Sequence, residues 1–155
     1  MFRITLVSVG KLKDREIEGF VLKYIKLLSP YAVINLVELK AEPFRDNSQK
    51  IKAKKAEGER IIKELKKKKL GTIVLLTEQG VSFNSMTFSQ KLESWGPEIT
   101  FVVGGALGLS TEVLKNFKNK LSLSPMTFPH EMARVVLLEQ IYRAVTILKG
   151  KEYHY

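Results

Sequence analysis

The sequence predicts an α/β protein in which helices cover both faces of a parallel sheet, an α/β/α sandwich. Two observations carry this prediction: short apolar runs rich in β-branched residues, and segments of helical periodicity between them. Regular alternation of strand and helix indicates βαβ units, whose strands are parallel. The 155 residues, 45% of them hydrophobic, suffice for one domain with a real core, and no linker or repeat divides residues 1–155.

The expected strands are short, apolar and bounded by turn-forming residues. They are expected at residues 2–9, 33–39, 72–77, 99–103 and 121–124. Glycine follows the first strand, and Glu78-Gln79-Gly80 predicts a turn at the end of the third. Residues 41–48 form a polar segment, which is either a plain connection or a lid over a ligand.

The expected helices have apolar residues at helical spacing and recognisable ends. They are expected at residues 14–28, 50–70, 87–95, 110–118 and 129–149. Thr87 and Gln90 predict a capping box, and Ser110 predicts a capped first turn. The long charged helix is expected to have a thin apolar face of Ile51, Ala56, Ile62 and Leu65. The last helix is expected to have an apolar face of Met132, Val135, Val136, Leu138, Tyr142 and Val145.

The chain is strongly basic, with 26 Lys and Arg against 16 Asp and Glu and a formal net charge of +10. This excess favours a polyanionic partner, although a solubilising lysine-rich surface or heat adaptation would also produce it. The run Lys66-Lys67-Lys68-Lys69 makes the end of the long helix basic. It is a candidate contact for RNA phosphates, but the helix dipole also favours cations at a helix end.

Composition excludes several classes of site. There are no cysteines, which rules out disulfides, zinc–thiolate sites and cysteine nucleophiles and suits a reducing, cytoplasmic location. Two histidines are too few for a credible metal site, so we expect no metal. No stretch is apolar for long enough to span a bilayer, and the first residues lack a signal-peptide layout, so we expect no membrane partner.

Two loops in the second half of the chain suggest a ligand site. The strand at 99–103 runs into Gly104-Gly105-Ala106-Leu107-Gly108, where glycines allow a sharp turn and a close approach to a ligand. The second loop, from Leu121 to His130, is interrupted by prolines. Two such loops at the carboxyl ends of strands are what a cofactor pocket requires, although tight turns alone are the simpler explanation. The glycine spacing matches neither a Walker loop nor the dinucleotide fingerprint.

A set of ordered motifs resembles one known family. The motifs are Val7-Ser8-Val9-Gly10-Lys11, Val103-Gly104-Gly105-x-x-Gly108, Leu121-Ser122-Leu123-Ser124-x-Met126-Thr127-Phe128-Pro129-His130, Arg134-Val135-x-Leu137-x-Glu139-Gln140-x-Tyr142-Arg143-Ala144 and Tyr153-His154. Together they resemble the RlmH family, SPOUT-class methyltransferases that modify N3 of a pseudouridine in large-subunit (23S) ribosomal RNA. The resemblance runs the whole length of the chain. Relatives often end in a basic residue, where this chain has Tyr155, and often have proline in place of Ala106.

This resemblance implies a fold, a cofactor and partners. It implies a deep trefoil knot formed by the chain after about Leu75, a homodimer packed through the last helix, and S-adenosylmethionine as methyl donor. The substrate would be the rRNA of an assembled ribosome. The positions that match the cofactor contacts of the family are Leu76, Gly104, Leu123, Ser124, Pro125, Met126, Thr127 and Phe128. Gly105 and Gly108, in the same glycine-rich turn, are further candidates for cofactor binding. For Leu76, Leu123 and Phe128 the alternative is an ordinary place in the core.

Methylation at N3 of pseudouridine requires removal of an imide proton or stabilisation of the resulting anion. The candidates are His154 as proton acceptor, Tyr153 for hydrogen bonding or stacking, Arg143 or Arg134 for the anion or a phosphate, and Glu139 as a base or as the partner of an arginine. The alternatives are surface ion pairs for the arginines, a solvated position for the glutamate and a frayed terminus for the tyrosine.

Two other functions remain open from the sequence. A non-catalytic RNA- or ribosome-binding module on the same fold would explain the basic charge but not the two loops. A nicotinamide-dependent oxidoreductase would fit a doubly wound sheet, but the glycine fingerprint and a ribose-binding acid after the first strand are missing. His130, in the first turn of the last helix, is expected to make a structural hydrogen bond.

Overall fold

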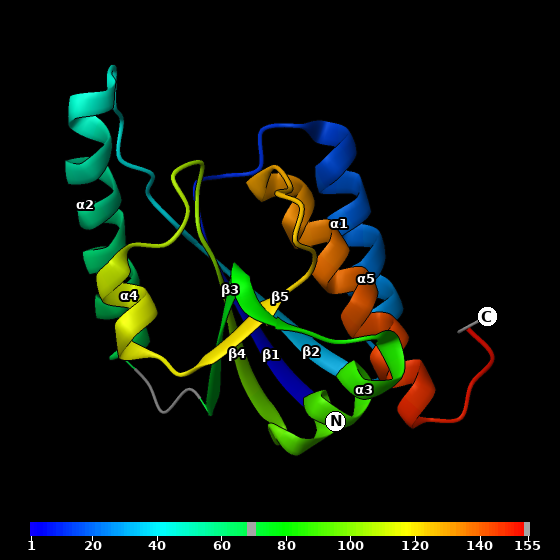
Figure 1. Ribbon diagram of the computed structural model, residues 1–155. Helices are drawn as coiled ribbons and strands as arrows, with labels where there is room; N and C mark the ends of the chain where they lie inside the picture. Colours follow the sequence, from blue (N-terminus) through cyan, green and yellow to red (C-terminus); the bar gives the residue numbers. More distant parts are fainter. Residues whose placement is uncertain (68–70, 154–155) are drawn as a thin grey trace.

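The computed structural model describes residues 1–67 and 71–153, in which strands and helices alternate along the chain (Figure 1). The elements in chain order are β1 (Phe2–Val9), α1 (Arg15–Leu28), β2 (Ala32–Leu39), α2 (Asn47–Leu65), β3 (Thr72–Ser82), α3 (Ser85–Ser94), β4 (Glu98–Val103), α4 (Thr111–Asn116), β5 (Asn119–Ser122) and α5 (His130–Leu148). Each of the predicted strands and helices is present, with ends that shift by a few residues.

The strands form one sheet in the order β2-β1-β4-β3-β5. Every neighbouring pair is parallel, which confirms the predicted parallel sheet. Helices α1, α3 and α5 cover one face, and α2 and α4 cover the other, as Figure 1 shows. The predicted three-layer α/β/α arrangement is therefore confirmed. The carboxyl ends of all strands lie along one edge, because parallel strands point the same way.

The two faces of the sheet bury alternate residues of the same strands. Leu6 and Phe101 pack against the helices α1, α3 and α5, whereas Val7 and Val102 pack against α2 and α4. Successive side chains on a strand point to opposite faces, so a strand covered on both faces must be apolar without interruption. This explains why β4, in the middle of the sheet, is buried from Ile99 to Val103.

The predicted apolar face of helix α2 is only partly the face that it buries. Leu65 is buried as predicted and Ile62 is half-buried, whereas the predicted Ile51 is 81% exposed. The other buried residues are Ala53, Glu57, Gly58 and Ile61. The prediction was wrong for Ile51 because α2 contains so few large apolar residues that its periodicity does not fix the phase. The helix also ends at Leu65, so Lys66 and Lys67 follow it, and Lys68 and Lys69 lie outside the described residues.

Two further helix predictions need correction. Helix α3 begins at Ser85, with Asn84 as its N-cap: the Asn84 side chain accepts a hydrogen bond from the Thr87 N–H at 2.8 Å, so Thr87 is not the cap. In α5 the buried residues are Arg134, Leu137, Leu138, Ile141, Ala144, Val145 and Thr146. Leu138 and Val145 are buried as predicted, whereas Met132, which the prediction also placed on the apolar face, is 38% exposed.

The turn predicted at the end of the third strand lies inside β3. Leu76 and Val81 both pair with Leu121 of β5, so residues 77–80 fall outside the regular ladder. Strand β3 then continues to Ser82. A Cβ on Gly80 would lie 2.6 Å from the carbonyl carbon of Leu121, which means that only glycine permits this close contact between the two strands.

Replacing Gly80 by alanine should lower the free energy of unfolding by about 1–3 kcal/mol, because the added methyl group overlaps the β5 backbone. The matched control is Gly19→Ala in α1, where the added Cβ meets nothing within 4 Å. That change should instead stabilise by roughly 0.5–1 kcal/mol through helix propensity. Urea unfolding of both variants measures the two effects, and equal stability of Gly80→Ala and wild type would contradict the close contact.

Candidate functional site

A cleft of about 750 Å³ opens at the carboxyl edge of the sheet. Its walls come mainly from three segments that leave the strands: residues 76–79 of β3, 103–109 after β4, and the loop between β5 and α5. Lys54 of α2, Leu114 of α4, and His130 and Ala133 of α5 complete the lining. The volume falls in the range of about 300–1,000 Å³ usual for small-molecule sites.

The predicted cofactor positions gather around this one cleft. The predicted residues that line it are Leu76, Gly104, Gly105, Gly108, Leu123, Ser124, Met126, Thr127 and Phe128. Pro125 is the exception, because it is absent from the lining. Met126 and Phe128 are 76% and 37% exposed, so neither is the core residue that was the alternative for Phe128. Exposed apolar side chains beside a cleft are suited to covering a flat apolar ligand.

Residues 104–108, which we call the glycine loop, form both a tight turn and a wall of the cleft. The N–H of Gly108 donates to the carbonyl oxygen of Gly105 at 3.0 Å, and Gly108 has a φ of +74°. A Cβ on Gly104 would lie 2.7 Å from the carbonyl carbon of Gly108. Glycine at position 104 is therefore required for the loop to fold back on itself, and the turn in turn shapes the cleft.

Helix α2 packs against the glycine loop through Glu57. Glu57 is only 4% exposed, and its Oε1 has no hydrogen-bond partner among the described residues. Its Oε2 accepts the backbone N–H of Glu42 at 3.0 Å. A Cβ on Gly105 would lie 3.6 Å from Glu57 Oε1, so this carboxyl faces the loop. Burial raises the pKa of Glu57, and the nearby Arg60 opposes that rise.

The second loop is braced by its own polar groups. The hydroxyl of Ser122 donates to the carbonyl oxygen of Ser124 at 3.0 Å, and the hydroxyl of Ser124 accepts the N–H of Met126 at 2.9 Å. These bonds hold the loop in an irregular course that the prolines already favour. The loop therefore presents both main-chain groups and apolar side chains to the cleft.

His130 lies in the lining of the cleft at the start of α5. No hydrogen bond joins its imidazole to another described residue, so the predicted structural hydrogen bond is absent there. Burial and the neighbouring Arg134 lower the pKa of His130, which keeps its ring neutral at pH 7. A neutral imidazole beside the cleft can accept a hydrogen bond from a ligand.

Arg134 has a structural position and does not reach an open site. It is 2% exposed, donates to the carboxylate of Glu38 at 3.0 Å, and donates to the carbonyl oxygens of Val9 and Gly10. These contacts tie α5 to the ends of β1 and β2. The proposed role of Arg134 at an anion or a phosphate is therefore corrected to a role in positioning α5.

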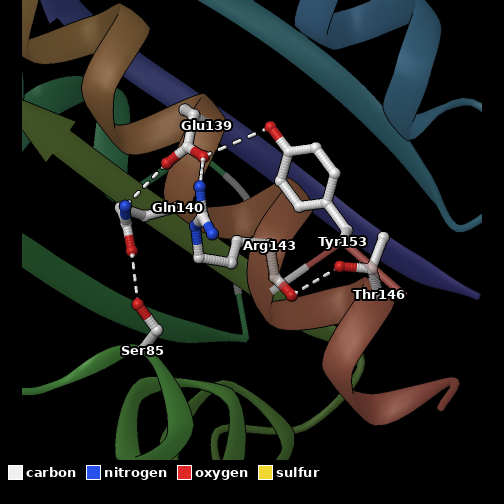
Figure 2. A network of polar contacts seen from close by, with 6 residues as sticks. All are labelled: Ser85, Glu139, Gln140, Arg143, Thr146 and Tyr153. Atoms are coloured by element: carbon white, nitrogen blue, oxygen red, sulfur yellow. Dashed lines mark hydrogen bonds and ion pairs between the residues drawn. The ribbon is translucent and has the colours of Figure 1, made fainter. Parts of the chain in front are cut away.

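The candidate catalytic residues of the last helix form a second polar cluster (Figure 2). Glu139 accepts hydrogen bonds from Nε and a terminal nitrogen of Arg143 at 3.1 and 2.6 Å, and from Gln140 at 2.6 Å. The Tyr153 hydroxyl lies 3.4 Å from the same carboxylate. Of the two roles considered for Glu139, the structure thus shows it as the partner of an arginine.

Tyr153 is held by ring contacts as well as by its hydroxyl. Its ring packs edge-on against Tyr142, with 4.7 Å between centroids, and the guanidinium of Arg143 lies 4.9 Å from its centroid. Burial, with Tyr24 and Glu139 nearby, raises the pKa of Tyr153 to about 12. The phenol therefore stays protonated at neutral pH and can donate a hydrogen bond. His154 lies outside the described residues.

Within one chain, this cluster is remote from the cleft. His130 is in the cleft lining, and Glu139 and Arg143 follow it on the same helix. At 1.5 Å per residue, these two residues lie roughly 14 and 20 Å farther along the axis. We call Glu139, Arg143 and Tyr153 the Glu139 cluster. None of these three residues lines the cleft. The structure thus brings the predicted cofactor residues together, and the described catalytic candidates together, but in two separate places.

Comparison with known proteins finds a matching family and relatives of similar length. A family described as "Predicted SPOUT methyltransferase" matches residues 2–154. Proteins named "Ribosomal RNA large subunit methyltransferase H" are 40% identical in Alkaliphilus oremlandii and 41% identical in Ruminiclostridium cellulolyticum. These matches cover 97% and 98% of this chain, and 98% and 99% of the relatives. This chain belongs to the RlmH family of SPOUT methyltransferases.

Solved structures with low sequence identity share the fold. A probable methylase family protein from Haemophilus influenzae has a TM-score of 0.56 at 14% identity, covering 99% of this chain and 70% of that one. TrmJ from Z. mobilis has a TM-score of 0.53 at 12% identity, covering 94% and 70%. At such identities the likeness concerns the fold alone. RlmH membership thus rests on the full-length relatives, and it makes the chain an RNA methyltransferase.

The sequence led us to expect neither a metal site nor a membrane partner. Among residues 1–67 and 71–153, no group of three or more His, Asp or Glu side chains is arranged to hold a metal ion. Within the same ranges, no helix has both the length and the apolar character that crossing a membrane requires.

The buried carboxyl of Glu57 should make stability depend on pH. Because its pKa is raised above the ordinary 4.5, the folded protein binds this proton more tightly than the unfolded chain does. Wild-type stability should therefore fall as the pH rises from 4.5 through the raised pKa. Glu57→Gln removes this titration, so the melting temperature of the variant minus that of the wild type should be more positive at alkaline than at acidic pH.

Glu59→Gln is the matched control, since Glu59 is an exposed carboxyl on the same helix. Its difference in melting temperature from the wild type should change little with pH. Thermal unfolding followed by circular dichroism in a pH series measures both differences. A Glu57→Gln profile parallel to that of the wild type would show that the Glu57 carboxyl does not titrate differently on folding.

Proposed function

We propose that this chain is an S-adenosylmethionine-dependent methyltransferase that methylates N3 of a pseudouridine in large-subunit (23S) ribosomal RNA, acting on the assembled ribosome. One observation carries the proposal: the two motif-bearing loops that resemble the RlmH family line a single cleft in a chain of that family. The full-length relatives named for methylation of large-subunit ribosomal RNA support the substrate.

The residues of the cleft fit S-adenosylmethionine. Leu76, Leu123 and Phe128 offer apolar surface for an adenine ring, and the glycine loop offers main-chain groups that can read its polar edge. The cleft volume of about 750 Å³ is sufficient for a nucleoside with an amino-acid arm. When bound, this cofactor supplies a methyl group activated by its sulfonium. The protein must align donor and acceptor and exclude water.

The Glu139 cluster fits the other half of the reaction. N3 of pseudouridine carries an imide proton, and removal of this proton leaves an anion that a cation can stabilise. Arg143, oriented by Glu139, is the candidate for stabilising that anion. Tyr153 can donate a hydrogen bond or stack on the base, since its hydroxyl stays protonated. His154 is proposed as the proton acceptor on the basis of the family resemblance.

A homodimer would join the two halves of this site. In one chain the Glu139 cluster lies at the far end of α5 from the cleft, so a second copy packed through α5 can bring its own cluster to the cleft. Family resemblance also supports the deep trefoil knot after about Leu75, a single SPOUT domain over residues 1–155, and a cytoplasmic location with the ribosome.

The direct test is transfer of labelled methyl from S-adenosylmethionine to ribosomes that lack the modification, with naked rRNA beside them. Wild-type protein should label one pseudouridine, on ribosomes in preference to naked rRNA. Binding of S-adenosylhomocysteine without any transfer would keep the cleft as a cofactor site and refute the substrate. Transfer would also exclude the non-catalytic binding module.

Gly104→Ala should reduce methyl transfer by at least tenfold, because the Cβ would force apart the backbone contact between Gly104 and Gly108. Its affinity for S-adenosylhomocysteine, measured by calorimetry, should fall in parallel. Gly19→Ala, far from the cleft, is the control and should leave both quantities unchanged. Full activity of Gly104→Ala would be incompatible with the assigned pocket.

Mixing two inactive variants tests the shared site. Gly104→Ala should damage the cleft, and Arg143→Ala should damage the Glu139 cluster. If each site takes its cleft from one subunit and its cluster from the other, a heterodimer keeps one intact site. After random mixing of equal amounts, about half of the dimers are heterodimers, and one of the two sites in each heterodimer is intact. The mixture should therefore recover roughly a quarter of wild-type activity. No recovery from subunits that have demonstrably exchanged would show that each chain uses its own cluster.

A further inference from the structure

The buried stripe of α2 continues into two lysines. The buried positions Ala53, Glu57 and Ile61 follow one another at four-residue spacing. Lys50 is three residues before Ala53 and seven before Glu57, and Lys54 is seven before Ile61. Residues separated by three, four or seven positions share one face of a helix. Lys50 and Lys54 therefore lie on the face of α2 that turns toward the protein, and we call them the inner lysine pair.

The inner lysine pair lies at the level of the cleft. Lys54 is in the cleft lining and half-buried, whereas Lys50, one turn earlier, is exposed. One turn after Lys54, Gly58 packs so closely on Ser110 that an added Cβ would collide with the serine side chain. This contact sets α2 against the segment after the glycine loop. In Figure 1 the first turns of α2 rise above the carboxyl edge of the sheet. Lys54 lines the cleft and Lys50 is one turn nearer the start of the helix, so the pair leads from the cleft outward.

No carboxylate among the described residues forms an ion pair with the inner lysine pair. Glu42 forms an ion pair with Arg60, and Asp46 accepts hydrogen bonds at the start of α2 from Gln49 and Ser48. Glu57 is buried; its Oε2 accepts the N–H of Glu42, and its Oε1 has no hydrogen-bond partner among the described residues. Among the described residues, no carboxylate lies within 4.0 Å of the ammonium of Lys50 or Lys54. The ammonium of Lys50 lies 5.8 Å from the centroid of the Phe44 ring.

We propose that the inner lysine pair binds the phosphate backbone of the substrate RNA beside the methyl-transfer cleft. This inference rests on the function proposed above and names the surface by which that substrate is held. The half-buried Lys54 takes a place on the inward face of α2 where an apolar residue would pack better, and an anionic ligand would offset that loss. Backbone phosphates supply negative charge regardless of base sequence, so they can position the target nucleotide.

The geometry favours RNA over the carboxylate of the methyl donor as the anion. Only Lys54 lines the cleft, whereas Lys50 stands one helical turn farther out, roughly 6 Å along the axis. Successive phosphates of a nucleic-acid strand are spaced on a similar scale, so a strand can contact both lysines. A small ligand inside the cleft would contact Lys54 alone. Arg45, exposed before the start of α2, extends the basic surface in the outward direction.

The test compares two double variants with the same loss of charge. Lys50→Gln with Lys54→Gln removes the inner lysine pair, and Lys52→Gln with Lys55→Gln removes two exposed lysines from the outer side of the same helix. Binding to ribosomes that lack the modification is measured from about 50 to 200 mM salt, where phosphate contacts dominate the salt dependence. Calorimetry with S-adenosylhomocysteine and circular dichroism are run on each variant.

The inner variant should bind ribosomes roughly tenfold more weakly, and its slope of log K against log salt should be shallower by about 1.4, since each lost phosphate contact removes about 0.7. The outer variant should differ from the wild type by less than about twofold, as expected for non-contacting charges. The circular dichroism spectrum should be unchanged in both variants, and the affinity for S-adenosylhomocysteine should be unchanged in the outer variant. Lys50→Arg with Lys54→Arg should restore binding, because the charges remain.

Three outcomes would overturn the inference. Equal ribosome binding by the inner and outer variants would show that only net charge matters. Loss of S-adenosylhomocysteine affinity in the inner variant would assign Lys54 to the carboxylate of the cofactor. Unchanged ribosome binding with the wild-type salt slope would remove phosphate contact altogether. If the wild type itself transfers no methyl to ribosomes, the function proposed above fails, which is a separate result from any of these three.

Discussion

The central place of β4 is the constraint on which the site depends. Because β4 lies between β1 and β3 and is covered on both faces, its carboxyl end emerges in the middle of the sheet edge. The chain turns at that edge by folding Gly104 against Gly108. A side chain at Gly104 would prevent that turn. The cleft exists because this turn and the loop after β5 leave the same edge and face each other.

A second constraint is that several glutamates are paired with arginines and so are not available to the lysines. Arg134 is paired with Glu38, Arg143 with Glu139, and Arg60 with Glu42. Each of these pairs fixes an element: the start of α5, the far end of α5, or the segment before α2. The lysines of α2 outnumber the carboxylates that remain, so the formal charge of +10 includes cations available to a polyanion. Two of them, Lys50 and Lys54, lie beside the cleft.

The elements that the sequence predicted well are those with strong periodicity. Apolar, β-branched runs located every strand to within a few residues, since a strand buried on both faces needs such a run. The phase of α2 was missed because Ile51 is its first large apolar residue and nevertheless points to solvent. Its buried stripe uses Ala53, Glu57 and Gly58, whose small size or buried charge gives no hydrophobic signal. Lys54 was missed for the same reason, since only the correct phase turns it toward the cleft.

The sequence by itself determined the alternation of strands and helices, the two loops after β4 and β5, and a set of ordered motifs specific enough to indicate the family. These are local properties of the chain, set by side-chain periodicity and by glycine and proline. Only the tertiary structure decided the strand order, the meeting of the two loops in one cleft, and the distance along α5 between His130 and Arg143. It also separated Arg134, buried against β1, from Arg143, held beside Tyr153. The physical reason is that these facts depend on which distant segments pack together, and periodicity within one segment contains no information about its neighbours.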